Sequence, residues 1–110
     1  MAKYVKNVHG NFDNILEKLD NAILSGSVSA SYEDGSDYQK GDFRCAVRVY
    51  ERYSYIGSNR VSMTLTLVGE NHQYKLIIIT SGGSQGILFK VNTWGEEAFL
   101  KKLDDILEEL

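Results

Sequence analysis

The chain has 110 residues, of which 43% are hydrophobic and 25% are charged. These values fit one soluble globular domain with a single core, and they exclude a disordered chain, a collagen-like fibre and a disulfide-scaffold peptide. The formal net charge is −3, whereas a surface that binds nucleic acid is usually basic. We therefore expect no nucleic-acid partner.

The sequence also predicts a cytoplasmic location. Cys45 is the only cysteine, so an internal disulfide is excluded and an oxidising compartment is not indicated. Residues 1–7 contain no apolar signal-peptide core. The longest strongly apolar run, residues 76–79, is far shorter than the ~20 residues that a membrane helix needs. We expect a soluble chain that makes no membrane contact.

The first part of the chain predicts a strand, a helix and a second strand. Residues 3–8 alternate loosely in polarity and predict a short strand. Asn11 is the expected N-cap of the helix that follows, because its side chain can accept a hydrogen bond from a backbone N–H of the first turn. Apolar side chains then recur every three or four residues, at Phe12, Ile15, Leu16, Leu19 and Ile23. Gly26 is expected to end this helix, and residues 27–33 alternate like a half-buried strand that leads into a turn at residues 34–37.

Residues 42–55 form the longest strand candidate. Alternation places one set of side chains on an inner, apolar face: Phe43, Cys45, Val47, Val49, Tyr53 and Tyr55. The other set, on the outer face, is Arg44, Arg48, Tyr50 and Arg52. Glu51 then falls on the apolar face, where a carboxylate is costly unless it is paired, hydrogen-bonded or protonated. It would either line a polar spot in a pocket or be turned outward by a β-bulge or a frayed strand end.

The remainder of the chain predicts three strands and a helix. The strands cover residues 61–67, 74–80 and 87–91. The segment 74–80 is apolar on both faces, as in a central strand that is covered on both sides or covered by a partner subunit. Thr93 and Glu96 match a capping box at the start of the last helix. Its apolar positions are Phe99, Leu100, Leu103, Ile106, Leu107 and Leu110.

This order predicts an α+β domain. We expect a curved antiparallel sheet of five to six strands, in the order strand, helix, four or five strands, helix, with both helices on one face. The order resembles the helix-grip architecture of the START and Bet v 1-type ligand carriers, and it is similar to one repeat of the TATA-binding-protein-like fold. The sequence also looks like small bacterial domain families of unknown function. These resemblances rest on element order and imply no functional residue.

No motif in the sequence predicts catalysis, a metal site or a cofactor. Residues 82–86 match the G-x-S-x-G pattern of a hydrolase nucleophile, but the following residues predict a strand where that turn requires a helix. The histidines, His9 and His72, both precede the serine, in the wrong order for a hydrolase triad. The same glycine-rich loop lacks the Lys-Ser/Thr ending of a phosphate-binding loop. The histidines and Cys45 are isolated, without the paired spacing of a zinc site.

Two functional hypotheses remain, both of them for a non-enzymatic protein. In the first, a small apolar or amphipathic ligand is held between the concave sheet and the C-terminal helix. The residues expected to line that site are Val47, Val49, Glu51, Tyr53, Met63, Leu65, Phe99 and Leu103.

The second hypothesis is a protein-interaction or homo-oligomerisation module. Every arginine of the chain lies within residues 44–60, and three of them share a strand face with a tyrosine. Arginine and tyrosine are enriched in the parts of interfaces that contribute most to affinity. The expected interaction face is Arg44, Arg48, Tyr50, Arg52 and Arg60. The alternative interpretation is an outer face held by cross-strand ion pairs.

Overall fold

The computed structural model describes residues 2–25, 30–54, 59–82 and 97–108. Along the chain the elements are β1 (Ala2–His9), α1 (Phe12–Ser25), β2 (Ala30–Lys40), β3 (Phe43–Ser54), β4 (Asn59–Glu70), β5 (Gln73–Gly82) and α2 (Glu97–Glu108). The predicted α+β class is confirmed, with an antiparallel sheet of five strands and two helices. The expected strand at residues 87–91 and the expected capping box of Thr93 and Glu96 lie outside the described residues.

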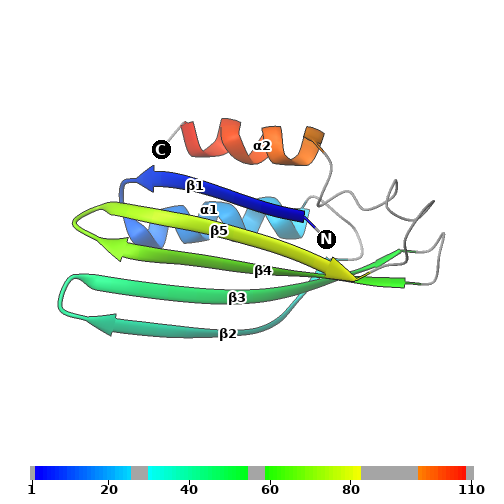
Figure 1. The fold of residues 1–110 in the computed structure, drawn as a ribbon, viewed down its shortest axis with the longest axis horizontal. Helices are drawn as coiled ribbons and strands as arrows, with labels where there is room; N and C mark the ends of the chain where they lie inside the picture. Colours follow the sequence, from blue (N-terminus) through cyan, green and yellow to red (C-terminus); the bar gives the residue numbers. More distant parts are fainter. Residues whose placement is uncertain (1, 26–29, 55–58, 83–96, 109–110) are drawn as a thin grey trace.

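The five strands form one sheet in the order β1-β5-β4-β3-β2. Strands β2 to β5 follow one another as a meander, and β1 pairs antiparallel with β5, so β1 and β2 are the two edges. Figure 1 shows the sheet with α1 behind it, along the direction of the strands, and α2 beside β1. Lys6 of β1 pairs with Asp104 of α2 at 2.8 Å, and the Tyr4 hydroxyl donates a hydrogen bond to the same carboxylate. Tyr4 and Lys6 lie on the side of the sheet that α1 covers, so both helices share one face.

The core fills the space between this face and the helices. α1 begins as predicted, because the Asn11 side chain accepts a hydrogen bond from the backbone N–H of Asn14 at 2.9 Å. The predicted apolar stripe of α1 is confirmed by the burial of Phe12, Ile15, Leu19 and Ile23. Fully buried side chains from the sheet and α2 include Tyr50, Met63, Leu65, Leu67, Leu76, Ile78 and Leu103. Burial stabilises each large apolar side chain by about 1.5–3 kcal/mol, so this core holds the helices against the sheet.

The predicted turn at residues 34–37 is wrong, because β2 continues through these residues to Lys40. The pairing of β2 with β3 shifts between Tyr32 and Asp34, which marks a β-bulge. Gly35 is required here by close approach and not by a turn: a Cβ would lie 2.6 Å from the Tyr32 hydroxyl and 2.8 Å from the Val47 carbonyl oxygen. The chain reverses later, at Gly41, which has a φ of +59°.

The predicted faces of β3 are also reversed. Ala46 and Tyr50 are fully buried on the side of the helices, next to Leu67 and Met63 of β4. Val47, on the face predicted to be inner, is only half-buried, and so are its neighbours on that face, Phe43, Cys45, Val49 and Glu51. Alternation divides a strand into two faces but does not say which one is covered. The helices cover the arginine-bearing face, where Arg44 pairs with Asp13 of α1.

We predict that replacing Gly69 in β4 by alanine destabilises the protein by about 2 kcal/mol or more. Gly69 has a φ of +154°, and a Cβ there would lie 2.3 Å from the Gln73 carbonyl oxygen of β5. Gly41→Ala is the matched control, because its φ is also positive but nothing lies within 4 Å of the added Cβ. Its cost is expected near 1 kcal/mol, from the backbone alone. Urea unfolding of both variants measures the difference, and equal losses would contradict the close approach of β4 and β5.

Candidate functional site

The predicted interaction face of arginines and Tyr50 is where α1 attaches to the sheet. Arg44 of β3 donates two hydrogen bonds to the Asp13 carboxylate of α1, at 3.0 and 3.1 Å. Its guanidinium carbon also lies 4.1 Å from the centre of the Phe12 ring. The guanidinium group lowers the pKa of Asp13 below its ordinary value, mainly through these hydrogen bonds. The charge of Arg44 is therefore balanced by a carboxylate of the same domain.

Tyr50 and Arg48 are held in the same way. The Tyr50 hydroxyl donates a hydrogen bond to Asp20 of α1 at 2.6 Å, and the side chain has no exposed surface. Burial raises the pKa of Tyr50 far above its ordinary value, and the hydrogen bond to Asp20 adds to the rise. Arg48 pairs with Asp37 of the neighbouring strand at 3.0 and 3.2 Å. These groups fix α1 and β2 to β3 and do not form a free interaction face.

The two remaining arginines of the predicted face are Arg52 and Arg60. Arg52 is half-buried on the helix side of β3. Arg60 of β4 lies on the opposite side of the sheet, where it pairs with Glu51 at 2.7 Å. Glu51 is therefore a half-buried carboxylate with a charged partner on the face away from the helices. The predicted five-residue face is not one continuous surface.

The structure also divides the residues that were expected to line a ligand site. Met63, Leu65 and Leu103 are fully buried between the sheet and the helices. Val47, Val49 and Glu51 lie on the other side of the sheet. The side chains of Tyr53 and Phe99 lie outside what the structure describes. A sheet separates the two groups, so these residues do not line one cavity.

Among the described residues, no helix or strand covers the sheet face opposite the helices, which we call the helix-free face. The viewer of Figure 1 looks onto it. The strand registers arrange it in three cross-strand rows, which are Lys3-Ile79-Thr64-Val49-Asp34, Val5-Ile77-Thr66-Val47-Ser36 and Asn7-Lys75-Val68-Cys45-Tyr38. Val5 is 47% exposed and Ile79 is 40% exposed, and within the described residues no element lies over them. The sequence signal for this face was the run at residues 74–80, which is apolar on both sides.

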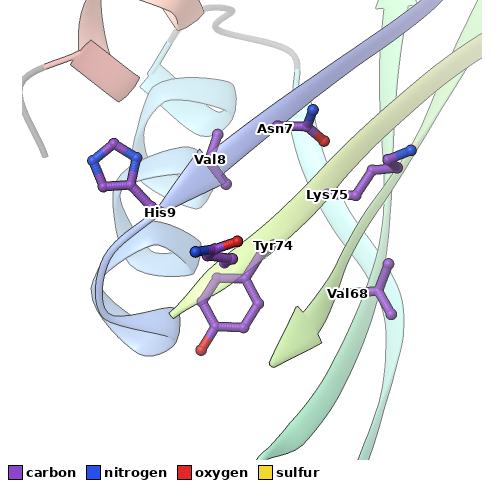
Figure 2. A pocket seen from close by; sticks show the side chains of 7 residues that line it. Asn7, Val8, His9, Val68, Tyr74 and Lys75 are labelled. Atoms are coloured by element: carbon purple, nitrogen blue, oxygen red, sulfur yellow. The ribbon is translucent and has the colours of Figure 1, made fainter. Parts of the chain in front are cut away.

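A shallow hollow of about 560 Å³ opens at one end of the strands. Its lining residues are Asn7, Val8, His9, Val68, Gln73, Tyr74 and Lys75. Figure 2 shows Asn7, Val68 and Lys75 on one side of β1 and β5, whereas His9 projects from the other side. The polar groups therefore do not converge on one point. Within the described residues, no group of three or more histidine, cysteine or acidic side chains is arranged to hold a metal ion.

Comparisons with known proteins identify a family but no activity. The sequence matches a family described as a family of unknown function, DUF6054, over residues 1–110. A comparison with curated proteins found no match. Among the described helices, none has the length and apolar character needed to cross a membrane.

We predict that the free energy of unfolding falls as the pH rises above 10, and that Tyr50→Phe makes this fall less steep. The folded state holds the Tyr50 proton above the ordinary pKa of 10.0, whereas the unfolded chain releases it there. The unfolded state then binds fewer protons, so alkaline pH favours unfolding. Urea unfolding from about pH 9 to about pH 11 measures the slope.

Tyr38→Phe is the control for this titration. Tyr38 is 57% exposed and its ring contacts only Phe43 among the described aromatic residues. Its removal should leave the alkaline slope unchanged. If the two variants have the same slope, the hydroxyl of Tyr50 does not titrate as its burial requires.

Proposed function

We propose that the chain, which belongs to the DUF6054 family, is a non-catalytic module that self-associates through the helix-free face. In this arrangement two copies pack face to face, and the helices of both copies lie on the outside. The observation that carries the proposal is β5, which presents Ile77 and Ile79 on the face that the helices do not cover.

The apolar part of the helix-free face is suited to sheet-on-sheet packing. Ile77 of β5 lies between Val5 of β1 and a threonine of β4. Ile79 lies between Lys3 and the other threonine, and Val47 and Val49 of β3 continue the surface. β-Branched side chains form a flat, stiff surface, and two such sheets pack about 10 Å apart. Each Å² of apolar surface removed from water contributes about 25 cal/mol. A second copy is the partner that supplies the same surface in return.

The charges at the ends of one row favour a two-fold arrangement. Lys3 at the β1 edge and Asp34 at the β2 edge are the ends of the row that contains Ile79, Thr64 and Val49. A two-fold axis parallel to the strands and centred on β4 places β1 of one copy over β2 of the other. Lys3 of each copy then faces Asp34 of its partner. Opposite charges at both ends of an apolar strip fix the orientation of two copies.

The size of the face agrees with a stable dimer. The molecule measures 45 × 25 × 21 Å, and Figure 1, viewed down the shortest axis, shows the sheet spread across the two longer dimensions. A standard protein interface needs about 800 Å² from each partner. The helix-free face is thus wide enough to form the contact without help from the helices.

We predict that Ile79→Lys converts a dimer into a monomer, because it buries an unpaired charge between the two apolar surfaces. Asn21→Lys is the matched control, since it adds the same charge on the exposed side of α1. Sedimentation velocity over a concentration series measures the association, and urea unfolding shows that both variants keep their fold. A wild-type chain that stays monomeric at high concentration would overturn the proposed function.

A charge exchange tests the two-fold arrangement itself. Lys3→Glu and Asp34→Lys should each weaken association about tenfold, because each places like charges opposite one another. The double variant restores the opposite charges in exchanged positions and should recover most of the affinity. Sedimentation equilibrium gives the three dissociation constants. If the double variant loses as much association free energy as the two single variants together, the two side chains do not meet across the interface.

A further inference from the structure

A second uncovered surface lies on the other side of the sheet, in a groove of about 480 Å³ between α1 and β2. Seven residues line it: Asp13, Leu16, Glu17, Asp20, Leu24, Tyr32 and Arg48. We refer to it as the α1–β2 groove. It plays no part in the self-association proposed above, because the helix-free face lies on the opposite side of the sheet.

One part of the groove is apolar. Leu16 and Leu24 of α1 are half-buried and pack against the core with one side only. Across from them the Tyr32 ring is 49% exposed and packs edge-on to Tyr50, with the ring centres 5.9 Å apart. The Tyr32 hydroxyl lies over Gly35, where only a glycine leaves room for it. This ring therefore lies along β2 and forms an apolar slot with the two leucines.

The other part of the groove is acidic. Asp13, Glu17 and Asp20 lie on consecutive turns of α1 and all contribute to the lining. Asp13 is paired with Arg44, and one oxygen of Asp20 accepts the Tyr50 hydroxyl. Glu17 is exposed and forms no ion pair or hydrogen bond within the described residues.

The basic residue of the lining does not neutralise these carboxylates. Arg48 is held by Asp37 of β2 at 3.0 Å, so its charge is balanced on the strand side of the groove. The α1 side keeps a surplus of negative charge from Glu17 and Asp20.

Within the described sheet, the groove runs beside an open strand edge. β2 is an outer strand of the sheet, and its residues are exposed along most of its length. An extended segment can pair with such an edge through its backbone while its alternate side chains enter the adjoining groove.

We propose that the α1–β2 groove binds an extended segment of a partner protein in which an apolar residue and a lysine or arginine stand two positions apart, so that both side chains point to the same side of the segment. The segment lies alongside β2, an apolar side chain enters the slot between Tyr32 and the leucines, and a basic side chain reaches Glu17 and Asp20. These two carboxylates are three residues apart on a helix, so one guanidinium or ammonium group can contact both.

A capped synthetic peptide, Thr-Arg-Thr-Leu-Thr-Arg-Thr, is the probe, because its leucine and arginines share one side of an extended chain. Its titration is followed by amide NMR in the Ile79→Lys variant, so that the result does not depend on self-association. We expect saturable shifts confined to α1, β2 and the adjoining part of β3. Glu17→Lys should weaken binding about tenfold or more, because it places a like charge opposite the basic side chain. Glu17→Gln should weaken it less, and the affinity should fall as the salt concentration rises.

Two controls separate recognition from general attraction between opposite charges. The same peptide with glutamate in place of each basic residue should not bind. Glu108→Lys, which removes an exposed carboxylate from α2, should leave the affinity unchanged. The absence of saturable binding, shifts on the helix-free face, or an unchanged affinity after Glu17→Lys would each overturn this proposal while leaving the proposed self-association intact.

Discussion

The attachment of α1 to one face of the sheet is the constraint on which the rest of the structure depends. Its apolar stripe decides which side chains of the strands form the core, and its acidic side chains hold Arg44 and Tyr50 of β3. The Arg44–Asp13 contact lies in the first turn of α1 and the Tyr50–Asp20 contact lies near its middle, and together they fix its position along the strands. Once both helices occupy this side, the other side of the sheet stays uncovered in the described part of the chain, and its composition becomes the main clue to function.

Much of the fold could be predicted from the sequence because the relevant signals are local. The three- and four-residue spacing of Phe12, Ile15 and Leu19 is a property of one helix, and the Asn11 cap is a contact between near neighbours. The order of elements followed from such signals. The order of strands across the sheet did not, because the pairing of β1 with β5 joins distant parts of the chain.

The wrong predictions for β3 and β2 have a common physical cause. Each sequence pattern is compatible with two structures, and tertiary contacts determine which one forms. On β3 an arginine face and a valine face alternate, and arginine was assumed to face water. The guanidinium group of an arginine also packs well over an aromatic ring, as that of Arg44 does over Phe12. On β2 the Asp-Gly-Ser-Asp stretch has the composition of a turn, but a β-bulge uses the same residue types. The residues expected to line a ligand site do not lie together, because those from β3 are on the face opposite to the one predicted.

The bulge in β2 also decides where two aromatic rings lie. Tyr38 lies six positions after Tyr32, so an uninterrupted strand would present both side chains on the same side. The register shift between them changes the phase of the alternation, and Tyr32 therefore pairs with Tyr50 beside α1, whereas Tyr38 pairs with Cys45 on the reverse side. A single additional residue thus supplies one tyrosine to each of the two surfaces. Deleting that residue would turn the side chains of β2 that follow the bulge to the opposite faces of the sheet. Tyr38 would then leave the helix-free face.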